Sequence, residues 1–142
     1  MIIGMGDDLC DIRRIETALN RHGDRFLNRC FTEVERAKAA RRKGKTEPAS
    51  TLAKRFAAKE ACVKALGTGF NHGIGFRHIG VVNAASGKPT LALTGPALDR
   101  LQSMTPKGMT ARIHITLGDE FPYARASVII EAIDSTLAAL HE

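Results

Sequence analysis

Glu60 and Lys64 lie four residues apart in a stretch of helix-favouring composition, Phe56-Ala57-Ala58-Lys59-Glu60-Ala61-Cys62-Val63-Lys64. This spacing places both side chains on one face of a helix. A carboxylate can hold a divalent cation while a lysine neutralises phosphate oxygens, so the pair suits phosphoryl chemistry if a second carboxylate arrives from elsewhere. The same spacing also describes an ordinary helix-stabilising ion pair worth about 0.2 to 0.5 kcal/mol. The pair alone leaves both interpretations open.

The N-terminal segment offers the second carboxylate. Residues 2–16 indicate a short strand, an acidic turn that contains Asp7, Asp8 and Asp11, and the start of a helix. Two glycines in the strand allow the backbone to pass close to a ligand, and a helix N-terminus favours anions. Asp8 or Asp11 is equally suited to capping that helix, and Asp7 is expected to be a solvated neighbour. Asp8 is therefore a candidate metal ligand with a helix cap as its alternative.

The N-terminal segment and the Glu60–Lys64 stretch together make the chain resemble the holo-acyl-carrier-protein synthase family, the small bacterial phosphopantetheinyl transferases. The first signature is Gly6-Asp7-Asp8 followed by Arg14-Ile15, and the second is Lys59-Glu60-Ala61 with Lys64 and Gly67-Thr68-Gly69. Further similarity lies in Lys54-Arg55-Phe56, Gly87-Lys88-Pro89 and His114-Ile115-Thr116-Leu117. The resemblance extends from Met1 to about Glu131. Asp7 departs from the family pattern, because a small polar or apolar residue usually stands there, and the tail after Glu131 is longer than the family core requires.

The resemblance implies a fold and an activity. The fold would be α+β, one domain over residues 1–142 with a mostly antiparallel sheet packed against a long central helix. The activity would be Mg²⁺-dependent transfer of 4'-phosphopantetheine from coenzyme A to a serine of apo acyl carrier protein, with release of adenosine 3',5'-bisphosphate, in fatty acid biosynthesis. Mn²⁺ would substitute for Mg²⁺. The family also implies a homotrimer with coenzyme A bound between subunits.

Roles for individual residues follow from the same resemblance. Asp8 and Glu60 would hold the metal ion, and Lys64 would neutralise charge that grows on the pyrophosphate. Either Glu60 or a metal-bound water would remove the serine proton. Arg14 on the first helix would contact acidic residues of the carrier protein. Besides Lys64, the coenzyme A contacts would be Arg55, His114, Lys88 and Thr116, although spacing alone describes His114 and Lys88 equally well as ordinary surface residues.

The composition agrees with an acidic partner. The 142 residues contain 21 Lys and Arg against 15 Asp and Glu, a net charge of +6. Coenzyme A, an acidic carrier protein and a nucleic acid all fit this sign. The absence of Trp and the single Tyr123 leave little for base stacking, so a nucleic-acid-binding domain is the weaker alternative. An inactive homologue that only binds the carrier protein is a third possibility, against which the presence of Asp8, Glu60 and Lys64 argues.

The remaining sequence features concern location and local structure. Residues 1–4 lack the features of a signal peptide, and no apolar run has the length of a membrane span, so a cytoplasmic protein without membrane partners is expected. Three widely spaced cysteines indicate reduced thiols. The basic run from Arg41 to Pro48 is expected to be a solvated loop. Hydrophobic periodicity and capping signals predict strands at 1–6, 79–83, 90–93, 113–117 and 124–130, and helices at 12–21, 32–40, 50–66, 96–104 and 133–140.

Overall fold

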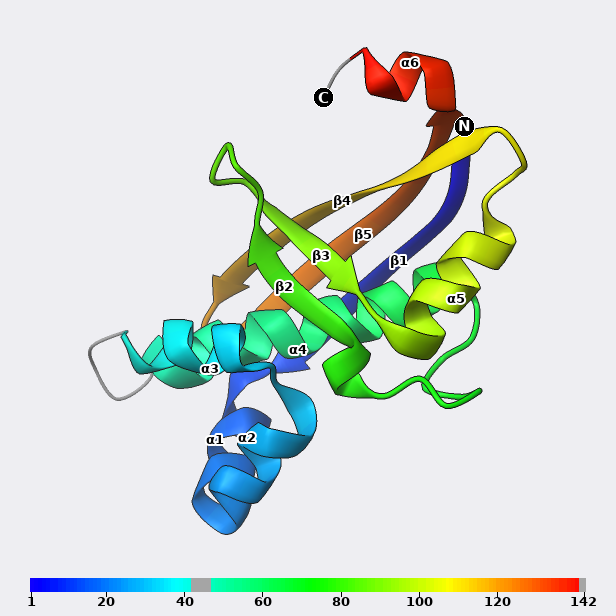
Figure 1. The fold of residues 1–142 in the computed structure, drawn as a ribbon. Coiled ribbons are helices and arrows are strands. Elements are labelled where there is room, and N and C mark those ends of the chain that lie inside the picture. Colours follow the sequence, from blue (N-terminus) through cyan, green and yellow to red (C-terminus); the bar gives the residue numbers. More distant parts are fainter. Residues whose placement is uncertain (42–46, 141–142) are drawn as a thin grey trace.

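A computed structural model describes residues 1–41 and 47–140 and has an α+β architecture (Figure 1). The strands are β1 (Ile2–Asp11), β2 (Ile79–Asn83), β3 (Pro89–Leu93), β4 (Met109–Glu120) and β5 (Tyr123–Asp134). The helices are α1 (Ile12–His22), α2 (Asp24–Cys30), α3 (Glu33–Ala40), α4 (Glu47–Leu66), the 3₁₀ turn η1 (Phe76–His78), α5 (Gly95–Met104) and α6 (Ser135–Ala139). The strands form a three-stranded sheet in the order β1-β5-β4 and a separate β2-β3 hairpin, and both are antiparallel.

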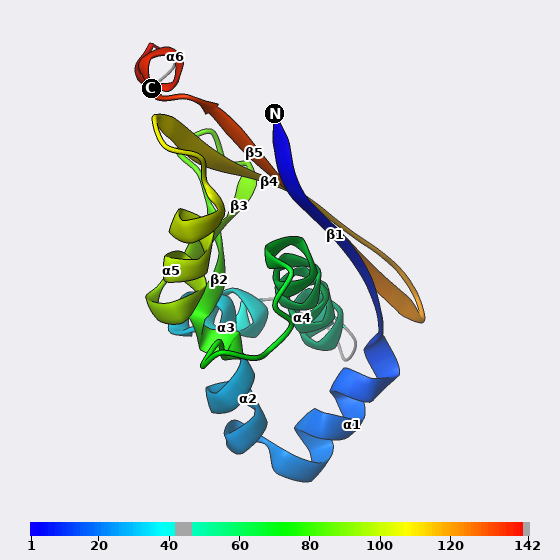
Figure 2. The same ribbon diagram turned by 90° about the vertical axis from the view of Figure 1, so that its right-hand side faces the viewer.

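Helix α4 occupies the centre of the fold. Figure 2 shows it between the three-stranded sheet on one side and a layer of β2, β3, α3 and α5 on the other. A helix enclosed in this way must be apolar around most of its circumference. Its buried apolar residues are Ala49, Leu52, Ala53, Ala57, Ala58, Ala61, Cys62, Val63, Ala65 and Leu66.

Strand β1 packs against α4 through direct backbone contact. A Cβ atom on Gly6 would lie 2.0 Å from the carbonyl oxygen of Ala61, and one on Gly4 would lie 2.3 Å from that of Ala65. Only glycine permits this approach, because the obstructing atoms belong to the helix backbone and cannot move aside. The contact brings β1 beside the part of α4 that carries Glu60.

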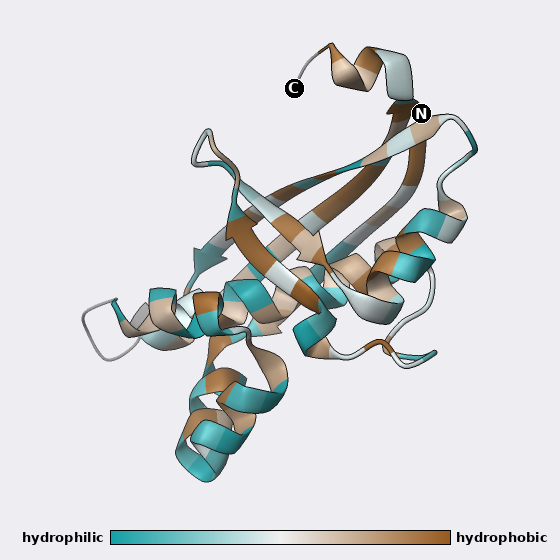
Figure 3. Cartoon of the chain, viewed as in Figure 1, coloured by the Kyte–Doolittle hydropathy of each residue, from teal (hydrophilic) through white to brown (hydrophobic). Residues whose placement is uncertain are grey.

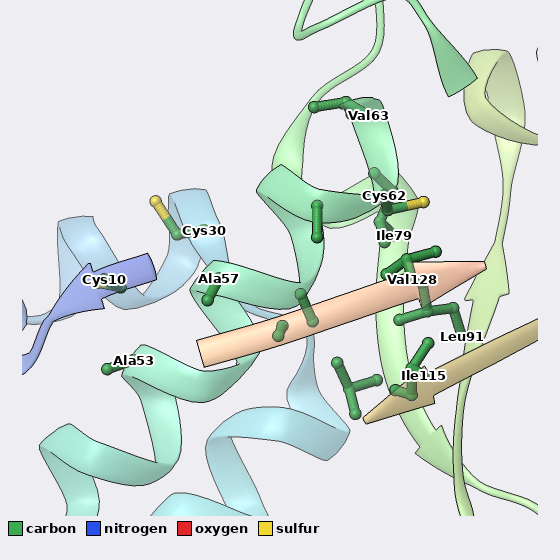
Figure 4. Close-up of a cluster of buried hydrophobic side chains, with 14 of the residues drawn as sticks. Cys10, Cys30, Ala53, Ala57, Cys62, Val63, Ile79, Leu91, Ile115 and Val128 are labelled. Atoms are coloured by element: carbon green, nitrogen blue, oxygen red, sulfur yellow. The ribbon is translucent and has the colours of Figure 1, made fainter. Parts of the chain in front are cut away.

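The sheet presents one apolar face to α4. Along β5 the buried residues alternate with more exposed ones, as the period of a strand dictates, and Val128 meets Ile115 of β4 in the core (Figure 4). On the far side of α4, Ile79 and Leu91 of the hairpin complete the same cluster. Figure 3 shows long hydrophobic stretches along β2 and β5, whereas hydrophilic and hydrophobic residues alternate along α1 and α2.

The structure confirms the predicted α+β class and the antiparallel strands packed against a long helix. The capping box at the start of α3 is present, with Thr32 as its N-cap, and Pro96 lies in the first turn of α5 as predicted. The predicted tail helix is shorter and covers only Ser135–Ala139. Part of the expected basic loop, residues 42–46, lies outside the described residues.

The predicted end of the first strand at Gly6 and the acidic turn predicted after it were wrong. The first strand does not end at Gly6 but continues to Asp11, so Asp7 and Asp8 lie within β1 and not in an acidic turn. The cap of α1 is Asp11, whose side chain accepts a hydrogen bond from the backbone N–H of Arg13 at 2.9 Å. Helix α2 was not predicted at all. Its seven residues follow Gly23, whose positive φ of 50° ends α1 and turns the chain.

Candidate active site

Asp8 faces helix α4. It follows Gly6 by two residues on β1, and residues two apart in a strand point to the same face. Its Oδ1 lies 2.7 Å from Nζ of Lys64, which also donates to the backbone carbonyl of Asp7 at 3.1 Å. The two sequence signatures therefore meet in space. The ion pair that Lys64 makes here is with Asp8, not the simple helical pair with Glu60 that its spacing allows.

Glu60 lies close enough to Asp8 for their charges to interact. Burial raises the pKa of Glu60, and the negative charge of Asp8 raises it further, while Arg14 and Lys64 act in the opposite direction. Two carboxylates that repel one another in a partly buried site are stabilised by a cation held between them.

The donor set fits a magnesium ion. Within residues 1–41 and 47–140 no cluster contains three or more His, Cys, Asp or Glu side chains, so the protein ligands here would be the two carboxylates of Asp8 and Glu60. Mg²⁺ commonly takes one or two carboxylates and fills its remaining positions with water and substrate phosphates. A zinc site, in contrast, needs three or four protein ligands.

Arg14 reaches the same region from α1. Burial raises the pKa of Glu60 and that of Cys10, which lies two residues beyond Asp8 on the same face of β1, and the positive charge of Arg14 opposes both rises. The side chain is exposed, so it is available to a partner. The residue expected to contact the carrier protein is therefore next to the expected metal ligands.

Asp7 points away from this site. It lies on the face of the three-stranded sheet that turns away from α4, which we call the open face. There its carboxylate accepts hydrogen bonds from Arg125 at 2.9 Å and from Ser127 at 2.5 Å. These bonds, with that of Arg125 the larger, lower the pKa of Asp7. The structure thus separates the two adjacent aspartates, and Asp8 is the one beside Glu60.

The structure does not bring the other expected coenzyme A contacts to this site within one chain. His114 and Thr116 lie on the open face, where Nε2 of His114 is 2.8 Å from Oε2 of Glu131. Lys88 lies in the exposed turn between β2 and β3. Arg55 is buried on another side of α4 than Glu60 and donates to the carbonyl of Thr51 at 3.0 Å.

Sequence reasoning assigned no role to Lys59, which is fully buried and forms a 2.7 Å ion pair with Glu35. Burial lowers the pKa of Lys59, and the charge of Glu35 opposes this effect. A signal was present in the sequence. Lys59 stands between Phe56 and Val63 in the apolar stripe of α4, at a spacing that points it into the core.

Comparison with known proteins agrees with this site. The family model of the 4'-phosphopantetheinyl transferase superfamily matches residues 4–120. The chain belongs to this superfamily and, within it, to the holo-[acyl-carrier-protein] synthases.

The holo-[acyl-carrier-protein] synthase of Beijerinckia indica is 62% identical over 135 residues, which cover 95% of this chain and 94% of the relative. The solved structure of the Neisseria meningitidis synthase has 37% identity and a TM-score of 0.75, and the match covers 92% of this chain and 99% of that one. The Bacillus anthracis synthase, solved in complex with CoA (3',5'-ADP), has 34% identity and a TM-score of 0.70, and the match covers 92% and 97% of the two chains.

Among the described residues, no helix combines the length and the apolar character that crossing a bilayer requires.

Proposed function

We propose that Asp8, Glu60 and Lys64 form the catalytic centre for transfer of 4'-phosphopantetheine from coenzyme A to apo acyl carrier protein. In this reaction a serine hydroxyl of the carrier protein attacks the β-phosphate of coenzyme A. The phosphopantetheine arm moves to the serine, and adenosine 3',5'-bisphosphate leaves. The observation that carries the assignment is the meeting of Asp8 with Lys64 at 2.7 Å, beside Glu60.

Asp8 and Glu60 are the residues that would hold Mg²⁺ or Mn²⁺. When bound, the cation draws charge from the attacked phosphorus and from the pyrophosphate oxygens. The repulsion between the two carboxylates supports this role, because it disfavours having both ionised without a cation.

Lys64 and Glu60 supply the protein's own chemistry. The ammonium of Lys64 is half-exposed, so it can contact the pyrophosphate oxygens and neutralise the charge that develops as the bond breaks. Glu60 accepts the serine proton on its carboxylate. Burial supports this role, because it raises the pKa of Glu60 and so makes its carboxylate a stronger base, whereas a bound cation acts in the opposite direction.

The surface of α1 would receive the carrier protein. Arg13, Arg14 and Arg21 are exposed on this helix, and Arg25 is exposed at the start of α2. Arg13 is paired with Asp11 at 2.7 Å, so the positive charges that suit an acidic partner are those of Arg14, Arg21 and Arg25. Arg14 is the specific contact that we propose, because it is the member of this group whose charge also acts on Glu60.

The coenzyme A site would be completed by a second copy of the chain. His114 and Thr116 lie on the open face, whereas Asp8 faces the opposite way. The open face also carries exposed apolar side chains of Met5, Leu9 and Tyr123. Exposed apolar groups on one face favour association. A homotrimer would bury this face and allow His114 of a neighbouring subunit to contact the 3'-phosphate, with Lys88 and Thr116 as further contacts. Arg55 lies on α4 and is only 7% exposed, so its side chain would have to turn outward to join them.

Mass spectrometry of apo carrier protein tests the function directly. After incubation with coenzyme A, this protein and Mg²⁺, the carrier protein should gain one phosphopantetheine group. The gain should disappear with a chelator and return with Mg²⁺ or Mn²⁺. If the chelated reaction proceeds at the full rate, the metal assignment is wrong. The proposed place in fatty acid biosynthesis predicts that the fatty acid carrier protein is a good acceptor.

A mixing experiment tests the shared site. Glu60→Gln and His114→Ala should each be nearly inactive alone, because each lacks a different part of the site. Mixed oligomers would contain some sites with an intact Glu60 from one subunit and an intact His114 from another. Partial recovery of activity after subunit exchange is expected. No recovery in oligomers shown by native mass spectrometry to be mixed would exclude a site shared in this way.

A further inference from the structure

The ammonium of Lys59 is completely enclosed by protein. Its Nζ lies 2.7 Å from Oε1 of Glu35 and donates to the backbone carbonyls of Phe76 at 2.9 Å and Ile79 at 2.6 Å. An ammonium group has three donors. All three are therefore used inside the fold, and Lys59, despite its place beside Glu60 in the sequence, does not act on a substrate phosphate.

Glu35 connects Lys59 to two further elements. Its Oε1 accepts a hydrogen bond from the backbone N–H of Thr32, and its Oε2 accepts one from that of Val81, both at 2.8 Å. The Glu35–Lys59 pair therefore joins the start of α3, strand β2 and helix α4. The ring of Phe31 covers the ammonium, with its centroid 5.6 Å from Nζ.

This pair holds the side of α4 that faces away from β1. Consecutive residues of a helix project about 100° apart, so the direction of Lys59 determines the direction of Glu60. On the other side, backbone contact with Gly6 holds α4 at Ala61. A small rotation or shift of α4 would move Glu60 relative to Asp8, and a displacement of about 1 Å at a catalytic group can reduce a rate by about 100-fold.

We propose that the Glu35–Lys59 pair is a positioning device that sets the rotation and axial position of α4, so that Glu60 and Lys64 face Asp8. Buried ion pairs are often no more stabilising than apolar residues of similar volume, which makes stability alone a poor reason for this one. The bonds from the ammonium to α3 and to the continuous η1–β2 segment are directional, so they fix the orientation of α4 more narrowly than apolar packing does. The proposal rests on the transfer reaction proposed above.

The double variant Glu35→Gln/Lys59→Met tests this. It removes both charges together, Gln keeps the capping-box acceptor, and Met retains the length of the buried stem. The matched control on the same helix is Lys54→Met/Asp119→Asn, which removes the partly exposed 2.9 Å ion pair between Lys54 and Asp119. Circular dichroism and thermal melts establish whether each variant is folded.

The expected result is a fall in kcat of about tenfold or more for Glu35→Gln/Lys59→Met, with the KM for coenzyme A changed less than about twofold. Mn²⁺ affinity, measured by electron paramagnetic resonance without substrates, should fall as well, because Glu60 is displaced from Asp8. The control double variant should retain the kcat and the Mn²⁺ affinity of the wild type.

A folded Glu35→Gln/Lys59→Met protein with wild-type kcat and Mn²⁺ affinity would overturn the proposal. Should this protein not fold, Glu35→Gln alone, which keeps the shape of the side chain, provides the same comparison. If neither variant folds, the pair serves stability and the proposal is also overturned. Failure of the wild type to modify the carrier protein would instead refute the transfer reaction itself.

Discussion

Nζ of Lys64 and Oδ1 of Asp8 lie 2.7 Å apart, although 56 residues separate them in the chain. The lysine is 54% exposed and the aspartate 16%, so the cation lies at the solvent side of the pair. Lys64 can therefore hold the carboxylate of Asp8 in place and still turn toward a phosphate. This one contact joins the metal-binding and phosphate-binding parts of the site.

Lys64→Met should reduce kcat by a factor on the order of 10² to 10³, which is the usual effect of removing a group that stabilises charge in a transition state. Stability should change little, because exposed ion pairs contribute only about 0 to 1 kcal/mol. Steady-state transfer assays and thermal melts measure the two effects. Lys107→Met, which removes an exposed lysine of the loop between α5 and β4, is the control. A Lys64→Met enzyme with wild-type kcat would contradict the assigned role.

Glu60→Gln and Asp8→Asn should each abolish most of the transfer, by on the order of 10² or more. Both substitutions preserve shape and remove a ligand charge. Raising the Mg²⁺ concentration should increase the rate of Asp8→Asn but not that of Glu60→Gln, because Glu60→Gln also lacks the proton acceptor. Rates over a range of Mg²⁺ concentrations measure this difference. Full restoration of Glu60→Gln by metal would mean that Glu60 serves only as a ligand.

Gly6→Ala should destabilise the fold by about 1 to 3 kcal/mol or more, as expected for forced overpacking. The new Cβ would lie 2.0 Å from the carbonyl oxygen of Ala61, so β1 must move away from α4. The transfer rate should fall by more than the loss of folded protein explains, because Asp8 moves with the strand. Gly75→Ala is the control, since a Cβ at that position would meet, among the described residues, only the ring of His78, at the ordinary van der Waals distance of 3.7 Å. Chemical denaturation and transfer assays on both variants provide the comparison.

Arg14→Ala should raise the KM for carrier protein by about fivefold, which corresponds to about 1 kcal/mol for an exposed charge contact. The KM for coenzyme A should change much less. Added salt should weaken the effect, because it screens exposed charges. An unchanged KM for carrier protein at low ionic strength would show that this arginine is not a contact.

All three cysteines should resist modification in the folded protein. Cys10, Cys30 and Cys62 are buried and free, and burial raises the pKa of Cys62 to about 12 and that of Cys10 to about 11. At about pH 8 these thiols are protonated, and the thiolate is the reactive form. A thiol reagent should therefore react slowly in buffer and rapidly in guanidinium chloride. Fast reaction under native conditions would indicate that the core opens readily.

Several elements could be predicted because their signals are local. The Thr32 capping box, Pro96 at the start of a helix and the strand at Ile79–Asn83 depend on neighbours within a few residues, and the structure has all three. Helix α2 escaped prediction because its seven residues have too short an apolar pattern. The extension of β1 to Asp11 also escaped it, since strand pairing with β5 outweighs the turn propensity of two adjacent aspartates.

The sequence by itself determined which groups are available for chemistry: a carboxylate and an ammonium one helical turn apart, and a second carboxylate after a glycine-containing strand. Only the tertiary structure decided which aspartate faces Glu60. Side chains alternate along β1, so Asp8 points toward α4 and Asp7 toward Arg125. The close approach of Gly6 to Ala61 holds the Asp8 face of β1 against the part of α4 that carries Glu60. The burial of Lys59 depended equally on packing, because its partners come from α3, η1 and β2. Such contacts between distant segments leave no local pattern in the chain.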